Sequence, residues 1–217
     1  MPTIEQARGW YPADDPVHGF DHVLRVYFMA ERLAQAEGAD LEIVRAAALL
    51  HDAGDSTAAE ADLPALRQGH QHASAEFAAS ILRAEGWPEG SISAVQHCIR
   101  AHRFRDDSEP PRTLEARVLF DADKLDAIGA IGVARAVAYA ARAGQPAYAP
   151  PSEQFLRSGQ TIAGEPHSAY HEFHFKLARL KDRLFTPAAR EIAEGRHQQL
   201  TAFFERLAEE SGDYPAG

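Results

Sequence analysis

Several histidines and aspartates of this chain continue apolar helical faces, where ionisable side chains are uncommon. His51 and Asp52 follow directly on the apolar run 46–50, and Gly54 comes two residues later. A lone inward histidine is usually a hydrogen-bonded core residue, but a buried carboxylate needs a charge partner or a metal ion. Imidazole and carboxylate together suit divalent ions such as Mn, Fe, Zn, Ni or Mg. The pair is therefore a candidate metal site at the end of a helix.

Four further side chains show the same placement on other segments with helical spacing. Residues at i, i+3, i+4 and i+7 share one face of a helix, so an ionisable residue in such a series faces the same side as its apolar neighbours. His22, His72, His102 and Asp123 each extend a series of this kind. Helix bundles build metal sites from inward side chains on facing helices, and this pattern predicts such a site.

The segments that must position these residues are predicted to be helices, with almost no strand signal. Gly38 is a natural stop for the first, and Asp40 can cap the second. The expected helices span about 21–37, 40–50, 72–85, 91–102, 113–144, 168–185 and 187–210. Segments 55–69, 103–112 and 144–167 are rich in Gly, Pro, Ser and charge and are expected to be loops. The last is long enough to be a lid or a binding loop, and one all-α domain is predicted.

Composition and charge narrow the classes of function. The chain has 217 residues, of which 45% are hydrophobic, enough for a sizeable core. We expect a cytoplasmic protein without membrane contact, because there is no apolar run of about 18 residues, no visible signal peptide and only one cysteine. The net charge of −10 disfavours DNA or long RNA as a partner. A small phosphorylated substrate requires a local positive centre, and a bound metal ion would supply one.

Five ordered segments resemble the HD-domain metal-dependent phosphohydrolases. They are HGFDHVLRV (18–26), AALLHDAGD (47–55), HQHASAEFAASIL (70–82), IRAHRF (99–104) and LFDADKLDAIGAIGVAR (119–135). With the C-terminal segment 174–210, the chain is most similar to the small bacterial subfamily that contains YedJ and YpgQ. An HD dipeptide alone is a weak signal, whereas the ordered set is specific. The resemblance implies one HD-type helical domain over 1–217, with its motifs in about 18–140 and the helices of 168–210 packed on that core.

The resemblance also implies which residues hold a first metal ion. Carried over to this chain, these are His22, His51, Asp52 and Asp123. Two alternatives lie close by in the same motifs, namely His18 in place of His22 and Asp121 in place of Asp123. One departure from the family is the stretch HDAGDSTAAEADLP, which lacks the Lys or Arg that many relatives carry just after the doublet.

Some members of the family bind a second metal ion through two further histidines. The matching positions in this chain are His72 and His102. A divalent ion lowers the pKa of its bound water, attracts phosphate and stabilises the charge that builds on phosphoryl oxygens. The number of ions and the identity of the metal stay open.

Candidate catalytic roles follow from the proposed metal ion and from the acidity of the chain. Asp52 is the candidate for orienting the nucleophile. Cations for the substrate are expected among Lys124, Arg135 and Lys176, although most such side chains are solvated surface charges. Candidates for orienting ligands or accepting a proton are Asp126, Asp121 and Asp55.

Other reactive residue types have ordinary interpretations. His97 lies on a different face from His102. His171 and His174 share a helix face, but no third ligand is evident there, and a half-exposed face is expected. Cys98 lies on an apolar face without a context that stabilises a thiolate, so it is expected in the core.

The main hypothesis is hydrolysis of a phosphoester or phosphoanhydride bond in a small nucleotide. One specific form is pyrophosphate release from a nucleoside triphosphate. An alternative is a di-iron oxygenase of the same fold, which requires two oxygen-reactive irons. Another is a non-catalytic nucleotide-sensing module, against which the complete set of ligands argues.

Overall fold

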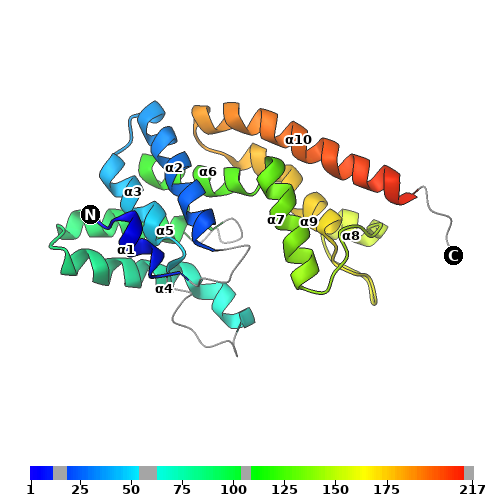
Figure 1. The fold of residues 1–217 in the computed structure, drawn as a ribbon, viewed down its shortest axis with the longest axis horizontal. Coiled ribbons are helices and arrows are strands. Elements are labelled where there is room, and N and C mark those ends of the chain that lie inside the picture. Colours follow the sequence, from blue (N-terminus) through cyan, green and yellow to red (C-terminus); the bar gives the residue numbers. More distant parts are fainter. Residues whose placement is uncertain (12–18, 54–62, 104–108, 213–217) are drawn as a thin grey trace. The chain divides into compact units, whose positions relative to one another are not determined.

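The protein is all-α over the residues that the computed structural model describes, which are 1–11, 19–53, 63–103 and 109–212. The helices are α1 (Ile4–Arg8), α2 (Phe20–Glu37), α3 (Leu41–Leu50), α4 (Leu63–Ala84), α5 (Glu89–Ala101), α6 (Leu114–Asp126), α7 (Gly129–Arg142), α8 (Glu153–Ser158), α9 (Ala169–Phe175), the 3-10 helix η3 (Leu177–Arg183) and α10 (Pro187–Gly212) (Figure 1). No strand occurs in this part of the chain, which confirms the expected fold class. No helix in the described ranges combines the length and apolarity needed to cross a membrane.

The chain forms two compact units. The first comprises residues 1–123 and 185–189, and the second comprises residues 124–184 and 190–217. All four predicted ligands of the first metal ion belong to the first unit, whereas Lys124 and Asp126 belong to the second. A single domain over the whole chain stays a prediction.

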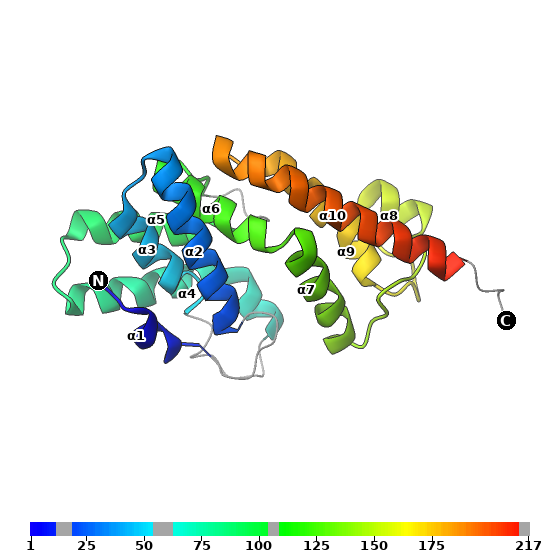
Figure 2. The same cartoon turned by 45° about the horizontal axis from the view of Figure 1, so that its top comes forward.

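Helix α3 is the centre of the first unit. Its residues Ile43, Val44 and Ala46–Leu50 are buried, and the helix contacts α1, α2, α4 and α5 (Figure 2). A helix that is apolar on nearly all sides is stable only when other elements enclose it. His51 follows at once as its C-terminal cap residue, so this enclosure fixes the position of the His-Asp doublet.

The segment 113–144, expected to be one long helix, forms the two helices α6 and α7, so that expectation is wrong. Between them Ile128 is extended, with φ −126° and ψ 170°, and Gly129 has a left-handed φ of 75°. A Cβ atom on Gly132 would lie 2.3 Å from the carbonyl oxygen of Ala127. Only glycine fits at these two positions, and the sequence AIGAIG was the signal for the break.

Other boundaries also differ from the expectation. Helix α4 begins at Leu63, so the end of the expected loop 55–69 is helical. The expected helix 168–185 comprises α9 and η3, which meet at Lys176. The expected loop 144–167 contains α8, whose N-terminus is capped by Ser152 because its side chain accepts a hydrogen bond from Phe155 N. Helix α1 was not expected at all.

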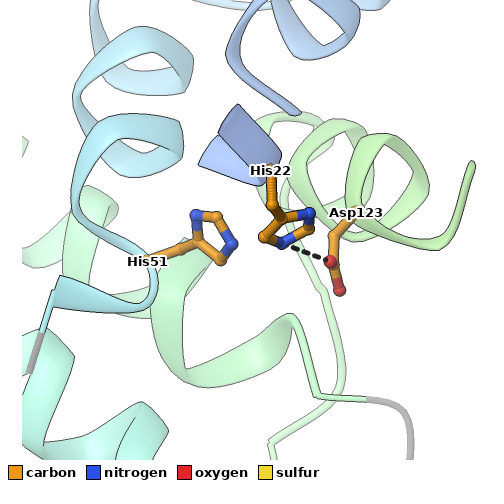
Figure 3. A group of neighbouring side chains, drawn as sticks. All are labelled: His22, His51 and Asp123. Carbon is orange, nitrogen blue, oxygen red and sulfur yellow. Dashed lines mark ion pairs between the residues drawn. The ribbon is translucent and has the colours of Figure 1, made fainter. Parts of the chain in front are cut away.

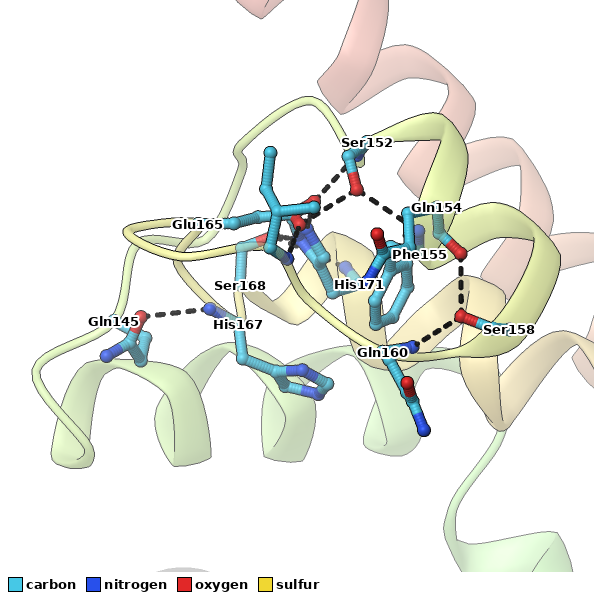
Figure 4. Close-up of polar contacts among 11 residues, drawn as sticks. Gln145, Ser152, Gln154, Phe155, Ser158, Gln160, Glu165, His167, Ser168 and His171 are labelled. Atoms are coloured by element: carbon cyan, nitrogen blue, oxygen red, sulfur yellow. Dashed lines mark hydrogen bonds and ion pairs between the residues drawn. The ribbon is translucent and has the colours of Figure 1, made fainter.

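A buried polar network in the second unit fixes the segment between α8 and α9 (Figure 4). The Glu165 carboxylate accepts hydrogen bonds from Ser152 N at 2.6 Å and Ile162 N at 2.7 Å. His171 Nε2 lies 3.1 Å from Glu165 Oε1, and His171 Nδ1 lies 2.7 Å from Ser168 Oγ. His171 is completely buried, so the expected half-exposed face is wrong for this residue. These contacts anchor a segment that was predicted to be a lid or a binding loop.

Candidate metal centre

Helix α2 places His22 inside the first unit. The residue is 1% exposed and shares its buried face with Val23, Val26 and Ala30. His22 N donates to Gly19 O at 2.9 Å, which closes the first turn of the helix. The predicted inward direction of His22 is confirmed.

His51 has a defined orientation at the end of α3. Its Nδ1 atom lies 2.8 Å from the carbonyl oxygen of Ala48. A carbonyl can only accept a hydrogen bond, so Nδ1 carries the proton in this contact. The Nε2 atom is buried and has no partner with hydrogen-bond geometry among the described residues. It points into the cluster, and its nearest carboxylate oxygen is Asp52 Oδ2 at 3.3 Å.

His102 is oriented in the same way at the end of α5. Its Nδ1 atom donates to Ile99 O at 2.5 Å, and the side chain is 4% exposed. The centroids of the His51 and His102 rings are 5.3 Å apart. His102 was expected to belong to a separate second site, but its Nε2 atom lies 3.6 Å from Asp52 Oδ1. In the structure this histidine belongs to the same cluster as His51.

Two carboxylates face these imidazole nitrogens. His22 Nε2 lies 3.5 Å from Asp123 Oδ1 and 3.9 Å from Asp52 Oδ2. The Asp52 and Asp123 side chains are 17% and 16% exposed, so the cluster is open to solvent on their side. Figure 3 shows the side chains of His22, His51 and Asp123 pointing toward one another from three separate elements.

The residues fit a divalent metal ion. One ligand atom each from His22, His51 and Asp123 lies within 4.8 Å of the others. Two ligands of the same ion, each about 2.1 Å from it, are about 3.0–3.4 Å apart, and the nitrogen–oxygen distances of 3.3 to 3.9 Å are close to this range. The buried His51 Nε2 atom is the decisive feature, since among the described residues it makes no hydrogen bond and has only the Asp52 carboxylate beside it at 3.3 Å, an arrangement that a metal ion between them would satisfy.

The charges of the cluster act strongly on one another. Burial alone lowers the pKa of His51, but the nearby carboxylate of Asp52, with a smaller effect of Asp123, raises it to about 9. Burial alone raises the pKa of Asp52, but His51, His102 and His22 hold it well below its usual value. Without metal, His51 therefore holds a second proton at neutral pH. A metal ion that binds Nε2 must replace this proton.

The structure separates the two competing aspartates of α6. Asp121 is completely buried and faces the start of α10. Its carboxylate accepts hydrogen bonds from Phe185 N at 2.9 Å, Thr186 N at 2.7 Å and Thr186 Oγ1 at 2.7 Å. Asp123 instead faces His22. This geometry favours Asp123 as the ligand and gives Asp121 a structural role.

His72 differs from the expectation. It was predicted to face inward with Ala75, but its side chain is exposed. The buried face of α4 continues through Gln71, four residues before Ala75, and this leaves His72 on the outer side. Among the contacts of the described residues none joins His72 to the cluster. His18 and Asp55, which were also candidates, lie outside the described residues.

The other predicted catalytic residues lie in the second unit. Lys124 is 6% exposed, so it is not a solvated surface charge, and it directly follows Asp123 in α6. Asp126 is 3% exposed and accepts a hydrogen bond from Arg135 Nη1 at 2.6 Å. Lys176 pairs with Glu172 at 3.6 Å. Arg135 and Lys176 thus have carboxylate partners, and their contact with a substrate stays a prediction.

Two residues with ordinary interpretations behave as expected. Cys98 is completely buried, and burial raises the pKa of its thiol. His97 uses both ring nitrogens in a local network, with Nδ1 2.7 Å from Glu109 Oε1 and Nε2 accepting from Arg112 N at 3.2 Å. Neither side chain belongs to the metal cluster.

Known proteins resemble this chain over most of its length. Residues 19–128 match the HD domain family. The chain is 32% identical over 214 residues to the uncharacterised protein YpgQ of Bacillus subtilis strain 168, a match that covers 95% of this chain and 93% of YpgQ.

Solved structures give the same result. The crystal structure of Bacillus subtilis YpgQ in complex with ADP matches with a TM-score of 0.71 and 32% identity, covering 96% of this chain and 97% of YpgQ. An HD-superfamily hydrolase of Bacillus thuringiensis matches with a TM-score of 0.69 and 29% identity, covering 97% of this chain and 95% of the hydrolase.

Proposed function

This chain belongs to the HD domain family, and on that premise we propose that it is a metal-dependent phosphohydrolase of small nucleotides. The proposed reaction is cleavage of a phosphoester or phosphoanhydride bond, in its specific form the release of pyrophosphate from a nucleoside triphosphate. One observation carries the proposal. The buried His51 Nε2 atom lacks a hydrogen bond and faces His22 and Asp123 at distances that suit a shared ion.

His22, His51, Asp52 and Asp123 would hold the divalent ion, which is Mn, Mg, Fe, Ni or Zn. Such an ion supplies Lewis acidity, a lowered pKa for water and compensation of phosphoryl charge. His102, bonded to Ile99 O and facing Asp52, supports that carboxylate or contributes to a second ion. The exposed His72 does not support the proposed second site.

Asp52 is the proposed group for orienting the attacking water. Its pKa is well below the usual value, so the carboxylate is ionised at neutral pH and accepts a hydrogen bond from water. Its side chain is also 17% exposed, which leaves an oxygen accessible. Position and charge therefore both support this role.

Lys124 and Asp126 complete the proposed catalytic set. Lys124 would offset the negative charge of the substrate, which a chain with a net charge of −10 otherwise repels. The bond from Arg135 already engages one Asp126 oxygen. This favours an orienting role for Asp126 over that of proton acceptor.

A nucleotide is the proposed substrate class because a relative binds one. YpgQ was crystallised with ADP, and this chain is 32% identical to it over nearly its whole length. We extend nucleotide binding to this chain on that basis. The base and the number of phosphates are left to the experiment.

The test is a matrix of metals and nucleotides with the purified full chain. Metal-stripped protein is supplied with each of the five ions and a panel of mono-, di- and triphosphates, and phosphate and pyrophosphate are measured. We expect release with at least one ion, loss of release in Asp52→Asn, and wild-type release in Asp21→Asn. Asp21 is the matched control because it is exposed and adjoins His22 on α2.

Two results would overturn the proposal. One is wild-type release by Asp52→Asn, and the other is no release from any nucleotide with any ion. Metal analysis of the purified protein is the parallel measurement. If the purified protein holds two irons per chain and absorbs visible light, the di-iron oxygenase becomes the better hypothesis and the hydrolase proposal is rejected.

A further inference from the structure

The N-terminal segment precedes the part of the chain that matches the family, yet it contacts three helices of the first unit. Trp10 packs edge-on against Phe77 of α4, with ring centroids 5.7 Å apart. Tyr11 packs against Phe20, the first residue of α2, also at 5.7 Å and with an interplanar angle of 43°. The third contact is made by the hydroxyl of Tyr11, which bonds to Leu49 O near the end of α3.

This third contact is a buried hydrogen bond between distant parts of the chain. Tyr11 Oη donates to the carbonyl oxygen of Leu49 at 2.8 Å across a separation of 38 residues. The last four carbonyls of a helix have no donor within the helix. Helix α3 does not end in a left-handed glycine cap, since its cap residue is His51 in the right-handed helical backbone conformation. Side chains supply the donors, with Tyr11 bonded to Leu49 O and His51 Nδ1 bonded to Ala48 O.

The contacts of Tyr11 with Phe20 and Leu49 each involve a residue that lies two positions before a predicted metal ligand. Phe20 precedes His22 on α2, and Leu49 precedes His51 at the end of α3. We propose that Tyr11 is a positioning residue for the metal centre, whose ring sets the start of α2 and whose hydroxyl closes the last turn of α3. This inference rests on the proposed function, since it assumes that the cluster binds a metal ion.

The hydroxyl acts on the metal site through His51. When Leu49 O loses its buried donor, opening of the last turn of α3 becomes less costly, because water can then reach the carbonyl. The neighbouring bond from His51 Nδ1 to Ala48 O directs Nε2 into the cluster. When the last turn of α3 is looser, the His51 ring is held less firmly, and its Nε2 atom points toward the metal site for a smaller part of the time. Partners that orient a ligand typically contribute 10- to 100-fold to metal affinity.

The test uses Tyr11→Phe, which removes the hydroxyl and keeps the ring, in the full chain. Tyr27→Phe is the matched control. Both tyrosines are 8% exposed, and within the described residues the Tyr27 hydroxyl makes no hydrogen bond. Mn²⁺ affinity is measured by electron paramagnetic resonance of the free ion. Amide hydrogen exchange of the peptide 47–53 is measured on metal-free protein, well below its unfolding temperature.

We expect Tyr11→Phe to bind Mn²⁺ roughly tenfold more weakly and to exchange faster in 47–53, while Tyr27→Phe matches the wild type. Unchanged Mn²⁺ affinity in Tyr11→Phe overturns the inference, whether or not exchange changes. If the wild type binds no divalent ion, the proposed function fails. In that case the exchange data alone decide whether Tyr11 holds the end of α3, and unchanged exchange refutes that contact as well.

Discussion

At the scale of single residues, the directions of the His51 and His102 rings are set by local bonds. His51 and His102 each donate from Nδ1 to the carbonyl three residues earlier. Both rings consequently turn Nε2 toward Asp52. A neutral imidazole has one donor and one acceptor nitrogen, so the bond to the backbone determines which nitrogen faces the cluster. The same bond fixes the tautomer that a metal ion requires.

Asp121 and Asp123 show how two similar residues differ by their partners. Asp121 accepts three hydrogen bonds from Phe185 and Thr186, and Asp123 faces His22. We expect Asp121→Asn to lower the free energy of unfolding by about 3 kcal/mol, since hydrogen bonds to a charged group contribute about 1.5–3 kcal/mol each. We expect Asp123→Asn to lose metal binding with a small effect on stability. Urea unfolding and Mn²⁺ titration of both variants check this prediction.

A milder variant protects this test against loss of folding. Thr186→Val removes only the hydroxyl, which donates to Asp121 Oδ2 at 2.7 Å and accepts a longer bond from Ala189 N at 3.4 Å, and should cost about 1–2 kcal/mol. The assignment is wrong if a folded Asp121→Asn protein no longer binds Mn²⁺ while Asp123→Asn binds it normally.

At the scale of elements, helix ends build the site. His51 and His102 are the C-terminal cap residues of α3 and α5, and Asp123 lies in the last turns of α6. Helix C-termini carry partial negative charge from their free carbonyls. The ends of α3, α5 and α6 therefore favour a cation at the cluster, in addition to the two carboxylates, whereas His22 lies in the first turn of α2, where the partial charge of the helix is positive.

The segment between α8 and α9 depends on the ionised form of Glu165. Burial alone raises the pKa of this carboxyl, but hydrogen bonds from Ser152 N, Ile162 N and His171 lower it to about 2. A carboxyl whose pKa is depressed in the folded state stabilises the protein above its unfolded pKa. That stabilisation is lost as the pH falls from about 4.5 toward 2.

We therefore expect the unfolding temperature of the wild type to fall over this acid range by more than that of Glu165→Gln. The variant should be less stable at neutral pH, where the charged network is intact in the wild type, and its own profile should be flatter. Thermal unfolding followed by circular dichroism between pH 2 and 6 measures both effects. Parallel profiles of the two proteins would contradict the role of Glu165.

At the scale of the whole molecule, charge separates small substrates from large ones. The net charge of −10 repels every phosphate of a nucleic acid, whereas one nucleotide needs only a local positive centre. The metal cluster and the buried Lys124 are the candidates for that centre.

We expect no retardation of labelled duplex DNA or long RNA in a gel-shift experiment at low salt, with metal present. Low salt is the stringent condition because counterion release makes nucleic-acid binding tightest there. Binding that weakens steeply as salt is added would contradict the prediction. A nucleotide should meanwhile bind the same preparation in a metal-dependent manner.

Most helices could be predicted from the sequence because their determinants are local. The apolar periodicity of α2 and α5, Gly38 after α2 and Asp40 before α3 gave boundaries within about two residues. The break between α6 and α7 was missed because the apolar pattern continues across it. The direction of His72 was predicted wrongly. It was grouped with Ala75 and Ala79, three and seven residues later, but a residue at this spacing lies at the edge of the apolar face, where the packing of neighbouring helices decides whether it is exposed.

By itself, the sequence determined the all-α class, the ordered motifs and the residue types of a metal site, since periodicity and motif order are properties of neighbours along the chain. The tertiary structure decided which residues meet. The ordered motifs had already named His22, His51 and Asp123 as ligands of one ion, and the structure places them together. Only the structure placed His102 beside Asp52 and used Asp121 to hold the start of α10. It also joined Tyr11 to Leu49. Such pairings depend on the packing of helices that are distant in sequence, and no local pattern encodes them.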